Sequence, residues 1–405
     1  MGRKLVRMDR VYDNLLVSHF KENRQMAFVT GPRQVGKTTT SQTGEAKAVY
    51  LNWDNQDVRQ AIAAGPDRVV KAYGLDTLVA GQSRVVFDEI HKYGKWKSFL
   101  KGYFDSYGNS LRTVVTGSAR LNVYKRGGDS LMGRYFPYRM HPFSVGELHT
   151  SELPDAEIRH PRPTPVTTLE QLLTFGGFPE PFLKADTRFY NRWRRLRTEQ
   201  LFQEDLRDLT NIQEIGQLEV MASLLRAQAG QLLNLSNLAR EVNISVDTAK
   251  RWMGALGALY YCFTIAPWFS NIPKSLRKQP KVYLWDWSVI PDKGAKIENL
   301  IASHLNKAVH LWTDMGFGEY QLCYLRDKQK REVDFVVVKE GAPWFLVEVK
   351  TSNRRLSQGL EYFMGATGAS HAFQVEWNAP YVDADCFDTR RPIIVPAATL
   401  LSQLV

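Results

Sequence analysis

The chain has 405 residues, 44% of them hydrophobic and 23% charged, with a formal net charge of +11. This length suits two to three domains, and this composition is ordinary for a globular protein. No run of about 18 apolar residues occurs, so we expect no membrane-spanning helix, and residues 1–10 lack the apolar core of a secretion signal. We therefore expect a cytoplasmic protein without a membrane partner.

The net charge indicates the kind of partner, and the cysteines indicate the redox compartment. A net charge of +11 favours a polyanionic partner, normally nucleic acid, over charge that serves only solubility. The three cysteines, Cys262, Cys323 and Cys386, lack the spacing of a metal site. They suit a reducing compartment and exclude both a disulfide framework and a cysteine zinc site.

A phosphate-binding loop follows the first apolar run, residues 26–30. Residues 31–38 match the pattern G-x-x-x-x-G-K-[ST] in full, between an expected strand and an expected helix, which disfavours a chance glycine-rich turn. Lys37 would reach the β- and γ-phosphates of ATP, and the Thr38 hydroxyl would ligate Mg²⁺. We predict that the nucleotide contacts Gly31, Pro32, Arg33, Gln34, Val35, Gly36, Lys37, Thr38 and Thr39.

A second apolar run, residues 84–87, ends in Asp88 and Glu89. Carboxylates at the end of such a strand lie at the ligand-binding edge of an open α/β sheet. Asp88 would hold Mg²⁺, and Glu89 would act as general base on the attacking water.

Two further runs, residues 48–51 and 112–118, complete a four-strand pattern separated by helical stretches, which predicts a parallel three-layer α/β sheet. Ser118, at the end of the last run, would either sense the γ-phosphate or occupy a strand-end turn. Arg134 is the candidate arginine finger, acting across a subunit boundary or in cis; Arg120 is its rival, and Arg134 could equally be structural.

The order GPRQVGKTT, VVFDEIHK, TGSARL, LMGRYFPYRMHPFSVGEL resembles bacterial and archaeal AAA-type ATPases whose C-terminal nuclease-like domain was long classed as of unknown function. The runs at 173–180 and 281–286 extend the resemblance over nearly the whole chain. The resemblance implies ATP binding and hydrolysis, but no defined biological role.

The middle of the chain predicts a helix-turn-helix. Residues 235–242 and 249–256 each present an apolar face, and Ser245 is a good N-cap for the second helix. Strands at 260–265 and 281–285 would supply a wing. Exposed residues of the second helix would contact the DNA major groove, unless this region only packs between the neighbouring domains; they are Asp247, Thr248, Lys250 and Arg251.

Two basic groups accompany this region. Lys274, Arg277, Lys278 and Lys281 could contact phosphates from the wing. The basic helical segment at residues 192–197 could be a solvated face or a phosphate contact.

The C-terminal part carries an Asp-x₁₃-Glu-x-Lys pattern formed by Asp334, Glu348 and Lys350. Two neighbouring strands would bring both carboxylates to one edge, and strand alternation puts Glu348 and Lys350 on one face. The pattern resembles the PD-(D/E)XK nuclease core. Asp334 and Glu348 would bind Mg²⁺ or Mn²⁺, Lys350 would stabilise developing charge, and Glu298 would add a ligand or a supporting contact.

The sequence therefore predicts an α/β multidomain protein. Residues 1–160 form an AAA-type P-loop ATPase, residues 161–280 a helical linker and winged helix, and residues 281–405 a restriction-endonuclease-like α/β domain. We expect an ATP-hydrolysing, DNA-interacting homo-oligomer with a metal-dependent nuclease domain. Two alternatives stay open: a nucleotide-dependent switch whose C-terminal domain docks DNA or protein without cleavage, and a protein-interaction ATPase of a defence or toxin–antitoxin type that binds no DNA.

Overall fold

The computed structural model describes residues 7–43, 48–76, 84–117, 131–206, 214–269, 279–352 and 355–405. The chain divides into two compact units. The first unit comprises Met1–His141 with Ser151–Leu153, and the second comprises Pro142–Thr150 with Pro154–Val405.

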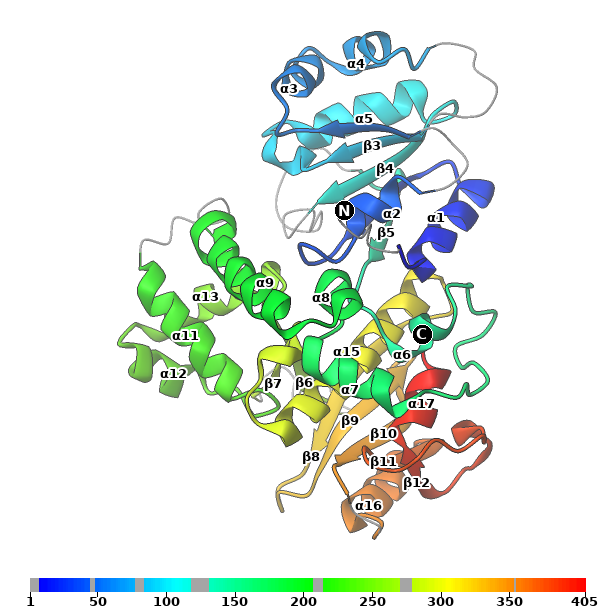
Figure 1. The fold of residues 1–405 in the computed structure, drawn as a ribbon, viewed down its shortest axis with the longest axis vertical. Helices are drawn as coiled ribbons and strands as arrows, with labels where there is room; N and C mark the ends of the chain where they lie inside the picture. Colours follow the sequence, from blue (N-terminus) through cyan, green and yellow to red (C-terminus); the bar gives the residue numbers. More distant parts are fainter. Residues whose placement is uncertain are drawn as a thin grey trace. The chain divides into compact units, whose positions relative to one another are not determined.

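The first unit is built on an entirely parallel five-stranded sheet in the order β2-β3-β4-β1-β5 (Figure 1). Four strands coincide with the predicted apolar runs, and β5 is an additional edge strand. The strands are β1 (Met26–Thr30), β2 (Ala48–Asn52), β3 (Arg84–Asp88), β4 (Arg112–Gly117) and β5 (Tyr135–Arg139). The helices are α1 (Val11–Glu22), α2 (Lys37–Ser41), α3 (Gln56–Ala63), α4 (Pro66–Ala72), the 3₁₀ turn η1 (Ile90–Lys92) and α5 (Trp96–Tyr107).

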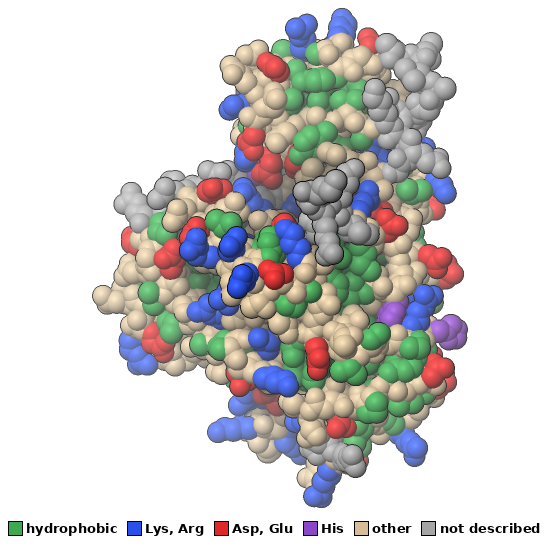
Figure 2. All heavy atoms as spheres, in the orientation of Figure 1, with side chains coloured by type: hydrophobic (Ala, Val, Ile, Leu, Met, Phe, Trp, Pro, Cys, Tyr) green, Lys and Arg blue, Asp and Glu red, His purple; other side chains and the backbone are tan. Residues whose placement is uncertain are grey.

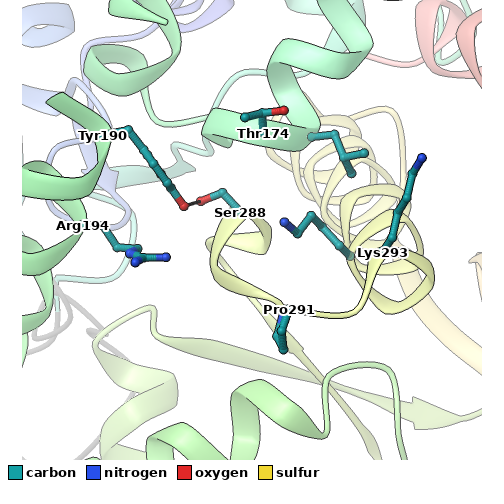
Figure 3. A pocket seen from close by; sticks show the side chains of 8 residues that line it. Thr174, Tyr190, Arg194, Ser288, Pro291 and Lys293 are labelled. Carbon is teal, nitrogen blue, oxygen red and sulfur yellow. Dashed lines mark hydrogen bonds between the residues drawn. The ribbon is translucent and has the colours of Figure 1, made fainter. Parts of the chain in front are cut away.

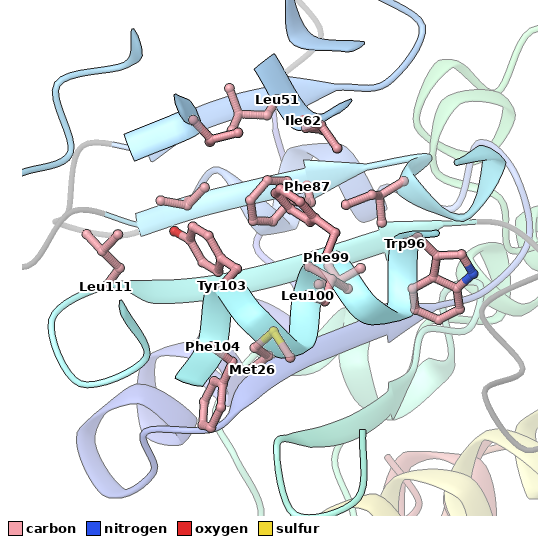
Figure 4. Packing of buried hydrophobic residues seen from close by; sticks show 14 of the residues in the cluster. Met26, Leu51, Ile62, Phe87, Trp96, Phe99, Leu100, Tyr103, Phe104 and Leu111 are labelled. Atoms are coloured by element: carbon pink, nitrogen blue, oxygen red, sulfur yellow. The ribbon is translucent and has the colours of Figure 1, made fainter. Parts of the chain in front are cut away.

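Successive side chains of β3 point to opposite faces of the sheet, and their contacts on the two faces show the three layers of the first unit. Val85 and Phe87 join the apolar cluster that α3, α4 and α5 form on one face; Figure 4 shows Phe87 packed beside Phe99 and Tyr103 of α5. Arg84, one residue before Val85, points to the other face, where its guanidinium lies over the Phe20 ring of α1, 5.4 Å from the centroid. Helices therefore cover both faces, as expected for a buried parallel sheet.

The second unit begins with a helical part. It comprises α6 (Val145–His149), α7 (Val166–Phe175), α8 (Pro179–Lys184), α9 (Thr187–Gln200), the π-helical turn η3 (Leu201–Asp205), α11 (Ile215–Ala227), α12 (Leu235–Val242) and α13 (Val246–Ala258). Helices α12 and α13 are the two predicted for the helix-turn-helix. Asn243 between them has a φ of 58°, and the Ser245 side chain accepts a hydrogen bond from Thr248 N, capping α13.

The rest of the second unit is a mixed seven-stranded sheet in the order β12-β11-β10-β9-β8-β6-β7. Its strands are β6 (Cys262–Pro267), β7 (Lys281–Leu284), β8 (Tyr320–Arg326), β9 (Glu332–Lys339), β10 (Ala342–Lys350), β11 (His371–Glu376) and β12 (Pro392–Pro396). The accompanying helices are the 3₁₀ turn η4 (Trp287–Val289), α15 (Lys293–Asp314), α16 (Gln358–Thr367), the 3₁₀ turn η5 (Cys386–Asp388) and α17 (Ala397–Gln403).

The hairpin of β6 and β7 forms where a wing was predicted, but it is also part of the C-terminal sheet. The two strands pair antiparallel, and β6 pairs in parallel with β8 through Ala266 and Cys323. The division of the second unit into two domains at residue 280 therefore stays a sequence-based prediction.

The architecture confirms the predicted α/β multidomain class: a P-loop parallel sheet, a helical region and a mixed α/β C-terminal part. Within the described ranges, no helix combines the length and apolarity needed to cross a bilayer.

Candidate functional site

The phosphate-binding loop connects β1 to α2 and has a backbone that its sequence explains. Gly31 and Gly36 have φ values of 155° and 105°, in the region that glycine adopts without a Cβ penalty. A Cβ on Gly31 would lie 2.3 Å from the Met140 carbonyl oxygen, so no larger residue fits there without a shift of the backbone. Gln34 also has a positive φ, 64°, which turns the loop back on itself.

Two basic side chains hold this loop. Lys37 is 8% exposed, and its Nζ donates hydrogen bonds to the carbonyls of Gly31 (2.9 Å) and Pro32 (2.7 Å). Arg10, just before α1, is buried; its Nη1 donates to the Val35 carbonyl at 2.7 Å and its Nη2 to the His141 carbonyl at 2.6 Å. Arg10 thus ties the outer side of the loop to the end of the sheet, a role that the sequence alone did not indicate.

Asp88 lies at the carboxyl end of β3, at the same sheet edge as the loop, because parallel strands end together. The Thr116 hydroxyl donates to its Oδ1 at 2.6 Å, and the Tyr50 hydroxyl donates to its Oδ2. The Thr38 hydroxyl is 3.5 Å from the same Oδ2. Burial, followed by the hydrogen bond to Asp88, raises the pKa of Tyr50, so its phenol remains a donor.

Glu89 follows Asp88 with a left-handed φ of 56°. Burial, and next the neighbouring Asp88 charge, raise the pKa of Glu89, whereas Lys92, Arg33 and Lys37 act in the opposite direction. Its Oε2 is buried and accepts no hydrogen bond from the described residues, although His91 Nε2 lies 3.5 Å away. A buried carboxylate with a raised pKa suits proton transfer from water.

These residues fit a magnesium nucleotide. The Thr38 hydroxyl and the Asp88 carboxylate meet at the loop, as a magnesium ion held between protein and phosphate requires. The Glu89 oxygen that accepts no hydrogen bond is free to accept one from a water molecule beside the nucleotide. Among the described residues, no group of three or more His, Cys, Asp or Glu could hold a metal ion, so the phosphates would have to supply further ligands.

Of the three residues predicted to contact the γ-phosphate, the structure describes only Arg134. Ser118 and Arg120 lie outside the described residues. Arg134 immediately precedes β5, and its carbonyl accepts a hydrogen bond from Met26 N at the start of β1. The loop leaves the opposite end of β1, five residues later, which is about 16 Å along a strand.

The prediction that Arg134 acts in cis is therefore wrong. Its Nε and Nη2 donate to the two Asp105 carboxylate oxygens at 2.8 and 3.0 Å, which holds the side chain at the amino edge of the sheet. Action across a subunit boundary stays a prediction.

In the second unit, the structure brings together the four residues predicted at the C-terminal site. Asp334 on β9 accepts a hydrogen bond from Val349 N of β10 at 2.9 Å, which locks the two strands side by side at this point. Glu348 Oε1 is 2.8 Å from Lys350 Nζ, so both side chains share one face of β10. Burial lowers the pKa of Lys350, but the contact with Glu348 and then the charges of Asp334 and Glu298 outweigh burial and raise it.

A fifth residue, Lys281, occupies the middle of this carboxylate cluster. Its Nζ lies 2.5 Å from Glu332 Oε1, 3.5 Å from Asp334 Oδ1 and 3.7 Å from Glu298 Oε1, and its side chain is 4% exposed. The prediction that Lys281 contacts phosphates from a wing is therefore wrong, because its charge is buried among carboxylates. Lys274, Arg277 and Lys278 lie outside the described residues.

The cluster is electrostatically strained at Glu298. Burial, and next the Asp334 charge, raise the pKa of Glu298 to about 7, although Lys281 and the Tyr283 hydroxyl (2.8 Å) favour its ionised form. Burial also raises the pKa of Asp334, against the effect of Lys281. One ammonium therefore compensates the carboxylates incompletely.

The cluster does not fit a divalent metal as arranged. Asp334 Oδ2 is taken by Val349 N, and Asp334 Oδ1 faces the Lys281 ammonium. A metal bonded to Asp334 at about 2.1 Å would lie within a few ångströms of that ammonium and repel it. The predicted Mg²⁺ or Mn²⁺ site at Asp334 and Glu348 has no support from this geometry.

The second helix of the predicted helix-turn-helix exposes basic side chains. Lys250 and Arg251 of α13 are exposed, as is Asp247, whereas Thr248 is half-buried and its hydroxyl accepts from Ser245 Oγ at 2.9 Å. Figure 2 shows further Lys and Arg side chains gathered where α9 lies. The exposed arginines of α9 are Arg188, Arg192, Arg194 and Arg195.

Three matches to protein-family models cover most of the chain. Residues 23–149 match the family described as "AAA domain". Residues 166–292 and 293–380 match two families described only as domains of unknown function, DUF8612 and DUF4143.

The sequence similarity to two relatives extends over both units of the chain. The uncharacterized protein Rv2008c of Mycobacterium tuberculosis is 23% identical over 350 residues, which are 83% of this chain and 72% of the relative. The uncharacterized protein MJ1544 of Methanocaldococcus jannaschii is 22% identical over 314 residues, 72% of this chain and 66% of the relative.

Two solved structures show more distant likeness. A RuvB of Thermotoga maritima matches with 13% identity and a TM-score of 0.27, over 62% of this chain and 86% of that one. A STAND-type signal transduction ATPase with a tetratricopeptide repeat sensor from Pyrococcus horikoshii matches with 10% identity and a TM-score of 0.26, over 78% and 46%. Together with the phosphate-binding loop, the family match identifies the N-terminal part of the chain as an AAA-type, nucleotide-binding ATPase domain.

Proposed function

We propose that the chain is an ATP-hydrolysing switch that binds nucleic acid and whose C-terminal domain holds its partner without cleaving it. The position of Lys281 carries this proposal, because its buried ammonium faces Asp334 and Glu298, two of the carboxylates that a nuclease would use for a metal ion. A divalent ion would have to displace a cation that is part of the fold.

In the ATPase part, each side chain has a distinct task. Lys37 exchanges its loop carbonyls for the β- and γ-phosphates, Thr38 and Asp88 hold Mg²⁺, and Glu89 takes a proton from the attacking water. The hydroxyls of Tyr50 and Thr116 keep the Asp88 carboxylate oriented, which their hydrogen bonds support.

Nucleic acid is the partner that the charge distribution favours. The net charge is +11, and basic side chains are exposed on α9 and on α13 at Lys250 and Arg251. Such side chains contact phosphates in a salt-dependent way. The second helix of a helix-turn-helix commonly enters the major groove of DNA, so we propose double-stranded DNA.

One observation favours a second candidate, the metal-dependent nuclease. Glu348 Oε2 is buried and accepts no hydrogen bond from the described residues, so one carboxylate oxygen of the predicted pattern has its ligand capacity free. Its partner Oε1 stays on Lys350. This candidate requires the Lys281 side chain to move.

Cleavage of supercoiled plasmid separates the two candidates. We expect the full chain to leave the plasmid intact with Mg²⁺ or Mn²⁺, with and without ATP, while it hydrolyses ATP and retards the plasmid at low salt. Linearisation that disappears in Lys350→Ala would establish the nuclease and refute the switch. ATP binding by Lys37→Ala equal to that of the wild type would overturn the assignment of the phosphate site.

The assembly and the compartment complete the proposal. Because Arg134 cannot reach the phosphates of its own chain, an arginine finger at this position would need a neighbouring subunit, and we propose a homo-oligomer. The described cysteines are free thiols, which suits the reducing cytoplasm.

A further inference from the structure

A cavity of about 420 Å³ lies in the second unit, apart from the carboxylate cluster. Residues of helices α7 and α9, the turn η4 and the start of α15 line it, and it is open to solvent on one side. Its volume falls in the range of small-molecule sites. The side chains that the argument uses are Thr174, Tyr190, Arg194, Ser288, Lys293 and Lys296.

Hydrogen bonds between buried side chains hold one wall of this cavity in place. Tyr190 and Ser288 are buried, and the Tyr190 hydroxyl donates to Ser288 Oγ at 3.0 Å, which joins α9 to η4 across the cavity (Figure 3). Ser288 Oγ in turn donates to Asp286 Oδ1. Because these two hydroxyls donate to groups of the protein, they hold the wall in place. The side chains that can bind a ligand here are the surrounding cations.

Three cations line the cavity without an acidic partner. Arg194, Lys293 and Lys296 form no ion pair with a carboxylate in the ranges that the structure describes. The neighbouring arginines of α9 differ: Arg195 lies 3.6 Å from Glu199, and Arg197 lies 3.1 Å from Asp286. Asp286, which accepts a hydrogen bond from Ser288 of the wall, is therefore already paired with Arg197.

The cations also act on one another. Burial lowers the pKa of the Lys296 ammonium, and the Arg194 charge adds to that effect, whereas Asp286 opposes it. The cavity therefore concentrates positive charge that an anion would relieve. Asp292 already caps α15 by accepting from Ala295 N at 2.7 Å, so this excess comes from side chains and not from the helix end.

We propose that this cavity binds a phosphate-bearing ligand of up to nucleotide size, with Arg194, Lys293 and Lys296 contacting the phosphate oxygens. Arg194 supplies a planar fork that matches two phosphate oxygens, and the lysines supply point charges. Leu173 and Pro291 leave an apolar side for the remainder of the ligand. The phosphate belongs either to a free small molecule or to a nucleic acid strand passing the cavity.

Calorimetric titration of the full chain tests the proposal. The Lys37→Ala background weakens phosphate binding at the P-loop, and the probes are inorganic phosphate, pyrophosphate and a 12-nucleotide single-stranded DNA. We expect Arg194→Met and Lys296→Met each to weaken pyrophosphate binding by about tenfold or more, as loss of a charged hydrogen bond implies. Arg390→Met and Lys328→Met, both at exposed positions of the same unit, are the matched controls, expected to stay within about twofold.

The probes also identify the source of the phosphate. A defect confined to phosphate and pyrophosphate indicates a free ligand, and a defect confined to the oligonucleotide indicates a strand. Equal affinities of all four variants for every probe, with melting temperatures unchanged, would overturn the proposal. The proposed switch would be unaffected by that result, because ATP hydrolysis and plasmid retention are measured separately.

Discussion

Lys281 Nζ lies 3.5 Å from Asp334 Oδ1, so the aspartate predicted to hold a metal ion instead faces a buried ammonium. The lysine comes from β7 and the aspartate from β9, two strands that are not neighbours in the sheet. A cation supplied by the fold therefore stands where the nuclease pattern calls for a cation from solution.

Removal of this ammonium should destabilise the second unit. In Lys281→Met, Glu298, Glu332 and Asp334 lose their shared counter-ion, and we expect a loss of about 3 kcal/mol or more in unfolding free energy. The measurement is urea denaturation, with Lys328→Met as the control for loss of an exposed lysine. Adding Asp334→Asn to Lys281→Met should recover part of the loss, since it removes one of the unpaired carboxylates.

The same variant tests whether the ammonium takes the place of a metal. We expect about 5 mM Mn²⁺ to raise the melting temperature of Lys281→Met and to leave that of the wild type unchanged, because only the variant lacks the ammonium that faces Glu298, Glu332 and Asp334. Equal stabilisation of both proteins by Mn²⁺ would contradict our interpretation of the cluster.

Glu298 should make stability depend on pH. Its pKa is about 7 when folded against an ordinary value of 4.5, so between these values the folded state binds more protons than the unfolded state. Stability then falls as pH rises through this window, by at most about 3 kcal/mol. Glu298→Gln cannot titrate, so the stability of the wild type relative to this variant should be greater at pH 5 than at pH 8.

Denaturation at several pH values checks this expectation. Glu361→Gln, an exposed glutamate of α16, serves as the control and should follow the wild-type profile. Parallel profiles for the wild type and Glu298→Gln would show that this carboxyl does not titrate in the window.

The first unit was largely predictable because its signals are local. The strands β1 and β3 are short apolar runs, and the loop between β1 and α2 is a contiguous motif. The contacts of Asp88 with Tyr50 and Thr116 were missed, because they connect three strands. The parallel register, which pairs Asp88 with Thr116, would have indicated one of them.

In the second unit, a local contact was predictable from the sequence, whereas contacts between distant strands were not. Strand alternation places Glu348 beside Lys350, and their contact at 2.8 Å follows from that local rule. Lys281 was assigned to a wing because its neighbours in sequence are basic. Its contacts with Glu332 and Asp334 depend on how the β6–β7 hairpin joins the sheet beside β8, and no local pattern encodes that pairing.

Glu89 should be needed for hydrolysis and not for nucleotide binding. We expect Glu89→Gln to bind ATP within about twofold of the wild type and to lose hydrolysis by at least about 100-fold, the typical effect of removing a general base. Calorimetry and a phosphate-release assay measure the two effects. Asp54→Asn is the matched control, since Asp54 contacts the same Lys92 but lies outside the proposed chemistry. Unchanged hydrolysis in Glu89→Gln would assign the base elsewhere.

Arg134 offers the sharpest test of whether a neighbouring subunit takes part in hydrolysis. Its two hydrogen bonds to Asp105 are exposed, so breaking them in Asp105→Ala should change stability little. We expect Asp105→Ala to hydrolyse ATP like the wild type, because the freed arginine can still reach another subunit. In Arg134→Ala, hydrolysis should fall about 1,000-fold if the residue is a finger in trans, and adding an Arg134-intact, Lys37→Ala protein should restore part of the rate in mixed assemblies. Wild-type hydrolysis in Arg134→Ala would instead make the arginine a structural partner of α5 alone.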